Sequence, residues 1–515
     1  MSVLAIDAGT TGVTALIIAP DGTVAASGYQ EFRQYFPEPG WVEHLPEEIW
    51  QAVLTACRQA IGAAGPDGAR ALSCIGITNQ RETAVVWDRA TLTAPRRAIV
   101  WQDRRTAALC AELREAGHEP QVAEVTGLRL DPYFTGTKLT WLARHEPELW
   151  SGVSDGSLAL GTVDSYLIAR LTGGRRHVTD ASNASRTLLF DLTAGQWSAQ
   201  MCDLLGVPPH ALPEVVPSTG VAGHSDPGAF LGLALPVAGI AGDQQAALFG
   251  QACYSPGAAK CTYGTGSFVL VNTGQAVVRS HAGLLSTVAW MDGEGALTYA
   301  LEGSIFVTGA AIQWLRDGLG LIADASESEQ LARSVSDTGG VVFVPALTGL
   351  GAPDWDPHAR GAIFGLTRGT TRAQLVRAAL EAIAFEVRDV VGLMTAEAGK
   401  AGQEAIRVDG GASANDLLMQ LQADQLQAPV ERPAIAETTA LGAAFLAGLA
   451  TGIWSSRAEL AAAWRLDRRF APGPPDEAGY RRWRSAVART TGWAADTAGQ
   501  PALVPAPHHR RAGTR

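Results

Sequence analysis

Two short turns rich in glycine and threonine have the composition of a phosphate-binding site. The first runs from Asp7 to Gly12 after the apolar run 3–6, and the second, from Thr262 to Gly266, reads TYGTG. Backbone N–H groups in such turns can surround an anion, and glycine lets a phosphate approach the main chain. A single turn of this kind is most often only a hairpin. Because the motif occurs twice between apolar runs, we expect the two turns to hold a triphosphate.

Two aspartates stand where a carboxylate could assist phosphate transfer. Asp7 ends the first apolar run, where one carboxylate near the phosphates suffices to hold Mg²⁺, although it could instead accept turn N–H groups. Asp243 follows the apolar run 237–241 and could accept the proton of an attacking hydroxyl. Its position alone favours another role, that of the N-cap of a helix.

Polar and aromatic side chains elsewhere could hold a small polyhydroxyl substrate. Arg81 as donor and Glu82 as acceptor could bracket adjacent hydroxyl groups, and Gln244 could both donate and accept. Trp101 and Phe268 could cover the carbon backbone. The alternatives are a solvated ion pair worth less than ~1 kcal/mol for Arg81 and Glu82, and ordinary core packing for the two aromatic residues.

A third glycine-bearing segment, VDGGASAN at 408–415, leads into the expected helix 416–426. Its Gly-Gly pair would let a flat adenine or ribose approach the backbone near a helix start. Turn geometry alone would also explain the glycines. The Walker A pattern is absent from the sequence, so a P-loop enzyme is not expected.

The elements that must position these residues are strands and helices in alternation. Apolar runs with a period near two predict strands, and apolar residues at helical spacing predict helices at 47–63 and 371–394. Thr371 and Gln374 form a capping box at the start of the second helix. The repeated glycine-threonine turn suggests two related halves, with a boundary near Gly250. The predicted strands are 3–6, 13–19, 24–29, 74–78, 84–87, 98–101, 237–241 and two within 259–271.

Composition narrows the class of protein. The chain has 515 residues and a formal net charge of −11, which disfavours non-specific binding to nucleic acid or anionic membranes. Its six scattered cysteines show no metal-ligand or disulfide spacing, so we expect reduced, mostly buried thiols. No segment is long and apolar enough for stable membrane insertion, and the start lacks a signal-peptide pattern. We therefore expect a cytoplasmic location and small-molecule partners.

The order and the amino-acid sequences of these segments resemble those of the FGGY family of carbohydrate kinases, and within it the members that phosphorylate glycerol. The matching stretches include GITNQRET, GIAGDQQAALFGQ, TYGTGSF and VDGGASAN, and the resemblance covers residues 1 to about 493. It implies an α/β fold of two ribonuclease H-like domains, of the actin-like ATPase type, with an inter-domain cleft. We expect an N-terminal domain at 1–250, a C-terminal domain at 251–493 and a disordered tail at 494–515.

The resemblance also implies a role for each candidate residue. Asp7 matches the metal-associated carboxylate and Asp243 the catalytic base. The positions that match glycerol-binding residues are Arg81, Glu82, Tyr133, Asp243 and Gln244, with Trp101 and Phe268 as apolar contacts. The positions that match nucleotide contacts are Thr10, Thr11, Thr265, Gly309, Gln313, Gly411 and Asn415, and Gly12 closes the same turn as the first two.

The implied activity is transfer of a phosphoryl group from ATP, with Mg²⁺, to glycerol. The products would be sn-glycerol 3-phosphate and ADP, as in the first step of glycerol catabolism, and we expect a homodimer or homotetramer. One departure is Thr14, which stands where the family has an arginine near the nucleotide phosphates. Two alternatives stay open: a related kinase of another polyol or ketose, and a non-catalytic actin-like sensor, which would lack the base or the polyol pocket.

Overall fold

The first half of the chain is built on a six-stranded sheet. The computed structural model describes residues 1–399 and 404–494. In the first sheet the strand order is β14-β15-β6-β1-β2-β3. Its strands are β1 (Ser2–Ala8), β2 (Gly12–Ile18), β3 (Val24–Glu31), β6 (Leu72–Asn79), β14 (Thr219–His224) and β15 (Pro236–Gly242).

The second half is built on a seven-stranded sheet that repeats this order. It reads β18-β19-β17-β16-β22-β23-β24, and β16 takes the place of β1. In each sheet the leading hairpin is antiparallel, the next two strands add in parallel, and the strand beyond them is antiparallel. The strands are β16 (Ala259–Tyr263), β17 (Ser267–Gly274), β18 (Leu285–Met291), β19 (Leu297–Ile305), β22 (Ile406–Asp409), β23 (Val430–Pro433) and β24 (Leu466–Phe470).

This repetition confirms the predicted α/β architecture of two related halves. Each glycine-threonine turn joins the leading hairpin of its sheet, between β1 and β2 and between β16 and β17. The two turns therefore occupy equivalent places in the two halves.

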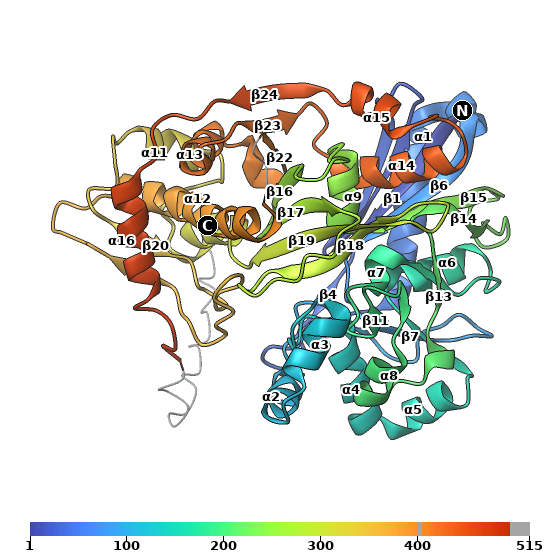
Figure 1. The fold of residues 1–515 in the computed structure, drawn as a ribbon. Helices are drawn as coiled ribbons and strands as arrows, with labels where there is room; N and C mark the ends of the chain where they lie inside the picture. Colours follow the sequence, from blue (N-terminus) through green and yellow to red (C-terminus); the bar gives the residue numbers. More distant parts are fainter. Residues whose placement is uncertain (400–403, 495–515) are drawn as a thin grey trace, which may run out of the picture.

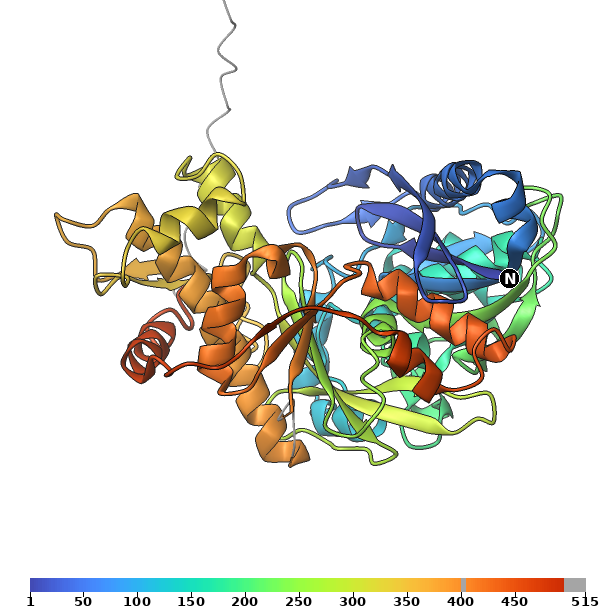
Figure 2. The ribbon, with the colours of Figure 1, turned by 90° about the horizontal axis from the view of Figure 1, so that it is seen from above.

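Helices cover both faces of the first sheet. Because successive residues of a strand point to opposite sides, alternate residues of β1 pack into two different cores. Leu4 and Ile6 of β1 pack into a core with α1 (Pro46–Ala71), whereas Val3 and Ala5 pack into a core with α9 (Asp243–Gly250) and α14 (Thr438–Ala450). In Figure 2 the orange α14 lies against the blue strands of the first half, and α14 contacts both β1 and β6. Thus α14, which lies far beyond the expected boundary at Gly250 in the sequence, packs on the sheet of the first half.

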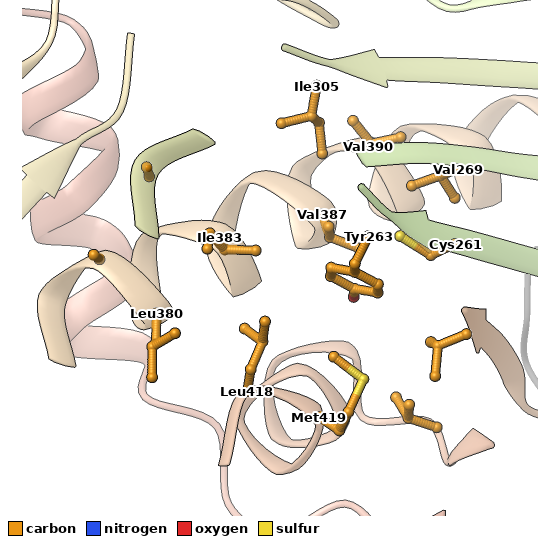
Figure 3. Packing of buried hydrophobic residues seen from close by; sticks show 14 of the residues in the cluster. Cys261, Tyr263, Val269, Ile305, Leu380, Ile383, Val387, Val390, Leu418 and Met419 are labelled. Carbon is orange, nitrogen blue, oxygen red and sulfur yellow. The ribbon is translucent and has the colours of Figure 1, made fainter. Parts of the chain in front are cut away.

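The core of the second half lies between its sheet and two helices, α12 (Arg372–Ala398) and α13 (Asp416–Leu426). Leu380, Ile383 and Val387 recur at helical spacing along α12 and belong to this core. Figure 3 shows Val387 beside Tyr263 of β16 and Leu380 toward Leu418 of α13. The predicted capping box is present at the start of α12. These contacts hold the second turn and the segment VDGGASAN on one rigid support.

A group of helices between residues 107 and 205 forms an added layer beside the first sheet, at the lower right of Figure 1. They are α2 (Ala107–Glu115), α3 (Glu119–Thr126), α4 (Thr135–His145), α5 (Pro147–Ser154), α6 (Val163–Leu171), α7 (Ala181–Ala184) and α8 (Ala199–Leu205). The other helices are α10 (Gly309–Gln313), α11 (Glu327–Arg333), α15 (Arg457–Ala463) and α16 (Glu477–Val487). Short strand pairs complete the fold: β4 (Gln34–Tyr35), β5 (Glu43–His44), β7 (Val85–Asp88), β8 (Ala98–Ile99), β9 (Leu158–Gly161), β10 (Val178–Asp180), β11 (Phe190–Asp191), β12 (Gln196–Trp197), β13 (Glu214–Val216), β20 (Val342–Val344) and β21 (Ala362–Phe364).

Three further expectations concern the cysteines, membrane-spanning segments and the C-terminal tail. All six cysteines are buried and unpaired, as predicted. Within residues 1–399 and 404–494, no helix combines the length and the apolar character needed to cross a membrane. The expected disordered tail lies outside the described residues, except for Ala494.

Candidate active site

The first phosphate turn lies at the end of β1 and contacts the loop that follows β6. Gln80 donates from its backbone N–H to Ala8 O (2.8 Å) and from Nε2 to Gly9 O (2.9 Å). Trp101 Nε1 donates to Thr10 Oγ1 (2.9 Å), while Thr11 is exposed. The predicted phosphate residue Thr10 and the predicted substrate residue Trp101 are thus joined directly.

The second phosphate turn is held against the start of α10. Gly309 donates its N–H to Gly264 O (3.0 Å), and Ala310 donates to Thr265 O (3.0 Å). A Cβ at Gly309 would lie 2.6 Å from Gly264 O, so this close approach of two backbones requires glycine. The Thr265 side chain remains exposed.

Five of the predicted nucleotide residues meet around one cavity of about 490 Å³. They are Thr265, Gly309, Gln313, Gly411 and Asn415. A Cβ built on Gly411 would meet nothing within 4 Å, which leaves room for a flat group. Asn415 caps α13 by accepting the N–H of Leu418 (2.9 Å). The cavity wall therefore combines glycine backbone with larger side chains, among them Ile312, Leu380 and Leu418.

The other predicted nucleotide residues belong to the opposite half. Thr10, Thr11 and Gly12 do not line this cavity. A Cβ at Gly12 would lie 2.7 Å from Tyr29 Oη, so packing against β3 already explains that glycine. Thr14 lies opposite Asp7 in the β1–β2 pairing.

A second cavity, of about 500 Å³, brings together the predicted apolar contacts. Trp101, Tyr133 and Phe268 line it, and their rings meet edge to face, with 5.6 Å between the centroids of Trp101 and Tyr133. Thr265 lines this cavity as well as the first. The tip of the second phosphate turn thus stands where the two cavities meet.

Arg81 lies beside this second cavity and is buried, so the predicted alternative of a solvated ion pair is wrong. Nη1 donates to Glu302 Oε2 (2.6 Å) and Gln245 Oε1 (3.2 Å), and Nη2 donates to Glu302 Oε1 (2.9 Å) and Tyr133 Oη (3.1 Å). Those four contacts use every N–H of the two terminal nitrogens. Nε lies 3.2 Å from Asp243 Oδ1.

Glu82 is equally fixed. Its backbone has a φ of +57°, in the left-handed region, and its carbonyl accepts hydrogen bonds from Thr135 Oγ1 (3.1 Å) and Lys138 Nζ (3.2 Å). Its Oε1 accepts from Arg186 Nε (2.7 Å). The carboxylate is therefore held in one orientation next to Arg81.

Asp243 is the first residue of α9 rather than its N-cap, which is Gly242. Its Oδ1 accepts the N–H of Gln244 (2.7 Å), and its side chain is 29% exposed. Burial raises the pKa of Asp243, although the cations of Arg81 and Lys260 oppose that shift. A partly exposed carboxylate with a raised pKa suits a proton acceptor.

Two carboxylates approach each other at the first turn. Burial, and to a lesser extent the charge of Asp243, raise the pKa of Asp7 to about 7. A buried carboxylate whose ionisation is further disfavoured by a second anion is a site that a cation would stabilise. Among the described residues there is no group of three or more His, Cys, Asp or Glu side chains that could hold a metal ion by itself.

Comparison with known proteins decides the family. A model of the FGGY family of carbohydrate kinases, N-terminal domain, matches residues 2–250, and the model of the C-terminal domain of that family matches 259–451. The chain belongs to the FGGY family of carbohydrate kinases.

Individual members of the FGGY family resemble the chain over almost its whole length. The glycerol kinase of Aromatoleum aromaticum is 55% identical over 495 residues, which cover 96% of this chain and 99% of that protein. The Plasmodium falciparum glycerol kinase, solved with ADP, has a TM-score of 0.87 at 36% identity and covers 95% of this chain and 98% of that one. The xylulose kinase of Rhodospirillum rubrum has a TM-score of 0.83 at 26% identity, covering 95% and 99%.

The site of this FGGY protein also contains charged residues that sequence reasoning missed: Arg186, Lys260 and Glu302. All three side chains are buried. Lys260 Nζ donates to Gln244 Oε1 and to Thr262 Oγ1 (2.8 Å), so it holds the amide oxygen of a predicted substrate residue. The available signal was a charged residue inside an apolar stretch, as in YALEGSIF around Glu302.

Proposed function

We propose that this FGGY protein is a glycerol kinase, which transfers the γ-phosphoryl group of ATP to a terminal hydroxyl of glycerol. The products are sn-glycerol 3-phosphate and ADP. The observation that carries this proposal is the meeting of the two cavities at Thr265, one lined by the predicted nucleotide residues and the other by aromatic rings. A nucleotide in the first cavity would direct its phosphates toward a small polyol beside the second.

Asp243 is the group that we assign to accept the proton. It begins α9 next to Arg81, whose Nε lies 3.2 Å from Asp243 Oδ1. A glycerol hydroxyl placed next to this pair, on the side where Asp243 is exposed, could give its proton to the carboxylate while Arg81 Nε–H stays directed at the same carboxylate or at the hydroxyl oxygen. As that oxygen bonds to the γ-phosphorus, the bond from phosphorus to the β,γ-bridging oxygen breaks and ADP leaves.

The remaining site residues bind and orient. We assign the backbone N–H groups of the two phosphate turns, with Thr10, Thr11 and Thr265, to the phosphates. Tyr133, Trp101 and Phe268 would cover the carbon atoms of glycerol and exclude water, which otherwise competes as phosphoryl acceptor. Gln244 and Glu82 supply further hydrogen-bonding groups beside them.

The residues at the first turn fit a magnesium ion. Asp7 would hold it, because burial and the nearby Asp243 make this carboxylate costly to ionise without a cation. Bound with ATP, Mg²⁺ neutralises charge on the phosphate oxygens. Thr14, in place of the family's arginine, would change the surroundings of the phosphates, but Asp7 and both threonines of the turn are present.

Glycerol fits better than a ketose or a sensor function. The relative at 55% identity is a glycerol kinase, whereas the xylulose kinase is 26% identical. A site in which buried polar groups are paired with substrate hydroxyls penalises analogues that leave one of them unpaired. A non-catalytic sensor would not need the carboxylate of Asp243 next to Arg81.

Two finer expectations accompany the proposal. We propose that residues 1–250 and 251–493 form the two FGGY domains, and that the enzyme works in the cytoplasm as a homodimer or homotetramer. Light scattering during size-exclusion chromatography gives the number of subunits, and a monomer at micromolar concentration would contradict the second expectation.

The function is tested by following the phosphorus atoms. Purified protein is incubated with ATP, Mg²⁺ and glycerol, and the products are identified by ³¹P NMR. We expect glycerol 3-phosphate and ADP in equal amounts, with little ADP formed when glycerol is omitted. Equal ADP release with and without glycerol, or no ADP at all, would contradict the proposal.

A further inference from the structure

The carboxylate of Glu302 reaches the glycerol side of the site from the other half of the molecule. It lies on β19 of the second sheet and is fully buried. Its two oxygens accept a bidentate pair of hydrogen bonds from Arg81, at 2.6 and 2.9 Å, and Oε1 also accepts from Arg186 Nη2 (2.9 Å). Ser304 Oγ adds a fourth contact at 3.2 Å.

These contacts link five side chains in which negative and positive charges alternate. We call them the charge chain: Glu82, Arg186, Glu302, Arg81 and Asp243. The charge chain begins at Glu82, the predicted acceptor for a glycerol hydroxyl, and ends at Asp243, the predicted base. Its middle member is the one that the second half contributes.

Stability alone is a poor explanation for this arrangement. Removing charges from water costs free energy that their mutual attraction often only offsets, so a buried ion pair is weak evidence of stabilisation. Glu302 is nevertheless not protonated in response to its burial. Burial alone would raise the pKa of Glu302, but Arg186 and Arg81 lower this pKa to about 2. Glu302 therefore stays ionised throughout the neutral pH range.

The geometry of Arg81 shows what the charge of Glu302 achieves. A planar guanidinium held by a bidentate carboxylate has a fixed orientation. Nη1 and Nη2 are occupied by Glu302, Gln245 and Tyr133. The remaining N–H is on Nε, which lies 3.2 Å from Asp243 Oδ1 and 3.6 Å from Glu82 Oε1. The orientation of Arg81 is thus decided by a residue that does not reach the aromatic-lined cavity.

We propose that Glu302 is a positioning residue for glycerol, which acts by holding Arg81 so that Nε–H and the Asp243 carboxylate converge on one hydroxyl group. Arg186 supports it by joining Glu302 to Glu82. The glycerol site of the first half is consequently incomplete without the second sheet. This inference rests on the proposed glycerol kinase function.

The test compares Glu302→Gln with the wild-type enzyme in steady-state kinetics. We expect KM for glycerol to rise by about 10-fold or more, because hydrogen bonds between charged groups are lost. KM for ATP should stay within about two-fold, since the nucleotide cavity is not touched. A glycerol KM within about two-fold of the wild-type value would overturn the proposal.

Two further variants separate positioning from a general effect on folding. Glu302→Asp keeps the charge, and we expect it to restore part of the glycerol affinity. Glu386→Gln is the control, because it makes the same Glu-to-Gln change in the second half, on α12, where the charged neighbours are Asp389 and Asp354 rather than the charge chain. An equal rise in glycerol KM in Glu386→Gln would overturn the proposal.

Thermal unfolding of each variant accompanies the kinetics. Should Glu302→Gln fail to fold, Glu302→Asp carries the test, and a glycerol KM unchanged from wild type would then refute the positioning role. A wild-type protein that phosphorylates no glycerol would instead refute the proposed function. Activity in the wild type with unaltered KM in both Glu302 variants would refute only this inference.

Discussion

The proposed glycerol pocket consists of the aromatic-lined cavity and the charge chain beside it. This pocket and the proposed nucleotide cavity lie on either side of Thr265 and are built on different principles. The wall of the nucleotide cavity includes backbone left bare by glycine, as at Gly309 and Gly411, beside larger side chains. The glycerol pocket depends on buried charged side chains that hold one another, above all Arg81 and Glu302. We therefore expect changes of charge to weaken the use of glycerol, and added side-chain atoms in the nucleotide cavity to weaken the binding of ATP.

The largest effect should come from the base. Asp243→Asn should reduce kcat by about 10²- to 10⁴-fold, the usual contribution of general acid–base catalysis, because the amide cannot accept the hydroxyl proton. Rapid-quench or coupled ADP assays measure this, and calorimetry should show that ATP still binds. The control is Asp226→Asn, an aspartate of the same half paired with the exposed Arg175. Turnover near the wild-type rate in Asp243→Asn would remove this residue from the role.

Adding atoms to the nucleotide cavity should have the next largest effect. Gly411→Val places methyl groups into space that is open in the structure, so we expect KM for ATP to rise by about 10-fold with KM for glycerol unchanged. Gly392→Val is the control, because it also meets nothing within 4 Å but lies on α12, away from the cavity. If Gly411→Val weakened glycerol instead of ATP, the assignment of the two cavities would be wrong.

The hydrogen bond between the glycerol pocket and the first phosphate turn should matter less. Trp101→Phe keeps an aromatic face in the glycerol pocket but removes the donor to Thr10 Oγ1. A neutral hydrogen bond contributes roughly 0.5–1.5 kcal/mol, which corresponds to a loss of about 2- to 10-fold in kcat/KM. Steady-state kinetics with each substrate varied in turn would show the loss for both substrates. No change in either would mean that the contact does not couple them.

The smallest effect concerns acid stability of the first half. Burial lowers the pKa of His177 to about 4, and its Nδ1 faces Arg89 Nη1 (3.1 Å) while Nε2 donates to Leu160 O (2.8 Å). Since the folded pKa lies below the ordinary value of about 6.5, protonation favours unfolding, and stability should fall as pH drops from 6.5 toward 4.

The pH dependence is measured by thermal unfolding at a series of pH values. In His177→Gln we expect a smaller decrease of the melting temperature between pH 6.5 and 4 than in the wild type. An identical decrease in both proteins would show that His177 is protonated without penalty in the folded state.

The sequence predicted the nucleotide cavity more completely than the glycerol pocket. Glycine-threonine turns and the segment VDGGASAN are local patterns, so Thr265 and Gly411 could be recognised within a few residues. The charge chain joins residues that are far apart in the sequence, and the local signal of a charge inside an apolar stretch does not tell which charges Glu302 meets. Only the folded structure brings them together.

The fold was predictable for the same reason. Apolar periodicity and the repeated turn indicated strands and two related halves, and the capping box marked the start of α12. The return of α14 to the first sheet could not be predicted, because its apolar stretch reads equally well as a core helix of either half. The N-cap alternative for Asp243 failed by one position, since Gly242 ends the strand and takes that place.

The most direct test of a glycerol site made by buried charges is the ratio of kcat/KM for glycerol to that for D-xylulose. ADP release is measured with ATP and Mg²⁺ across glycerol, dihydroxyacetone, erythritol and xylulose. We predict that glycerol exceeds xylulose by about 100-fold or more, because a mismatched substrate leaves buried polar groups unpaired. A kcat/KM for xylulose equal to or above that for glycerol would contradict the account.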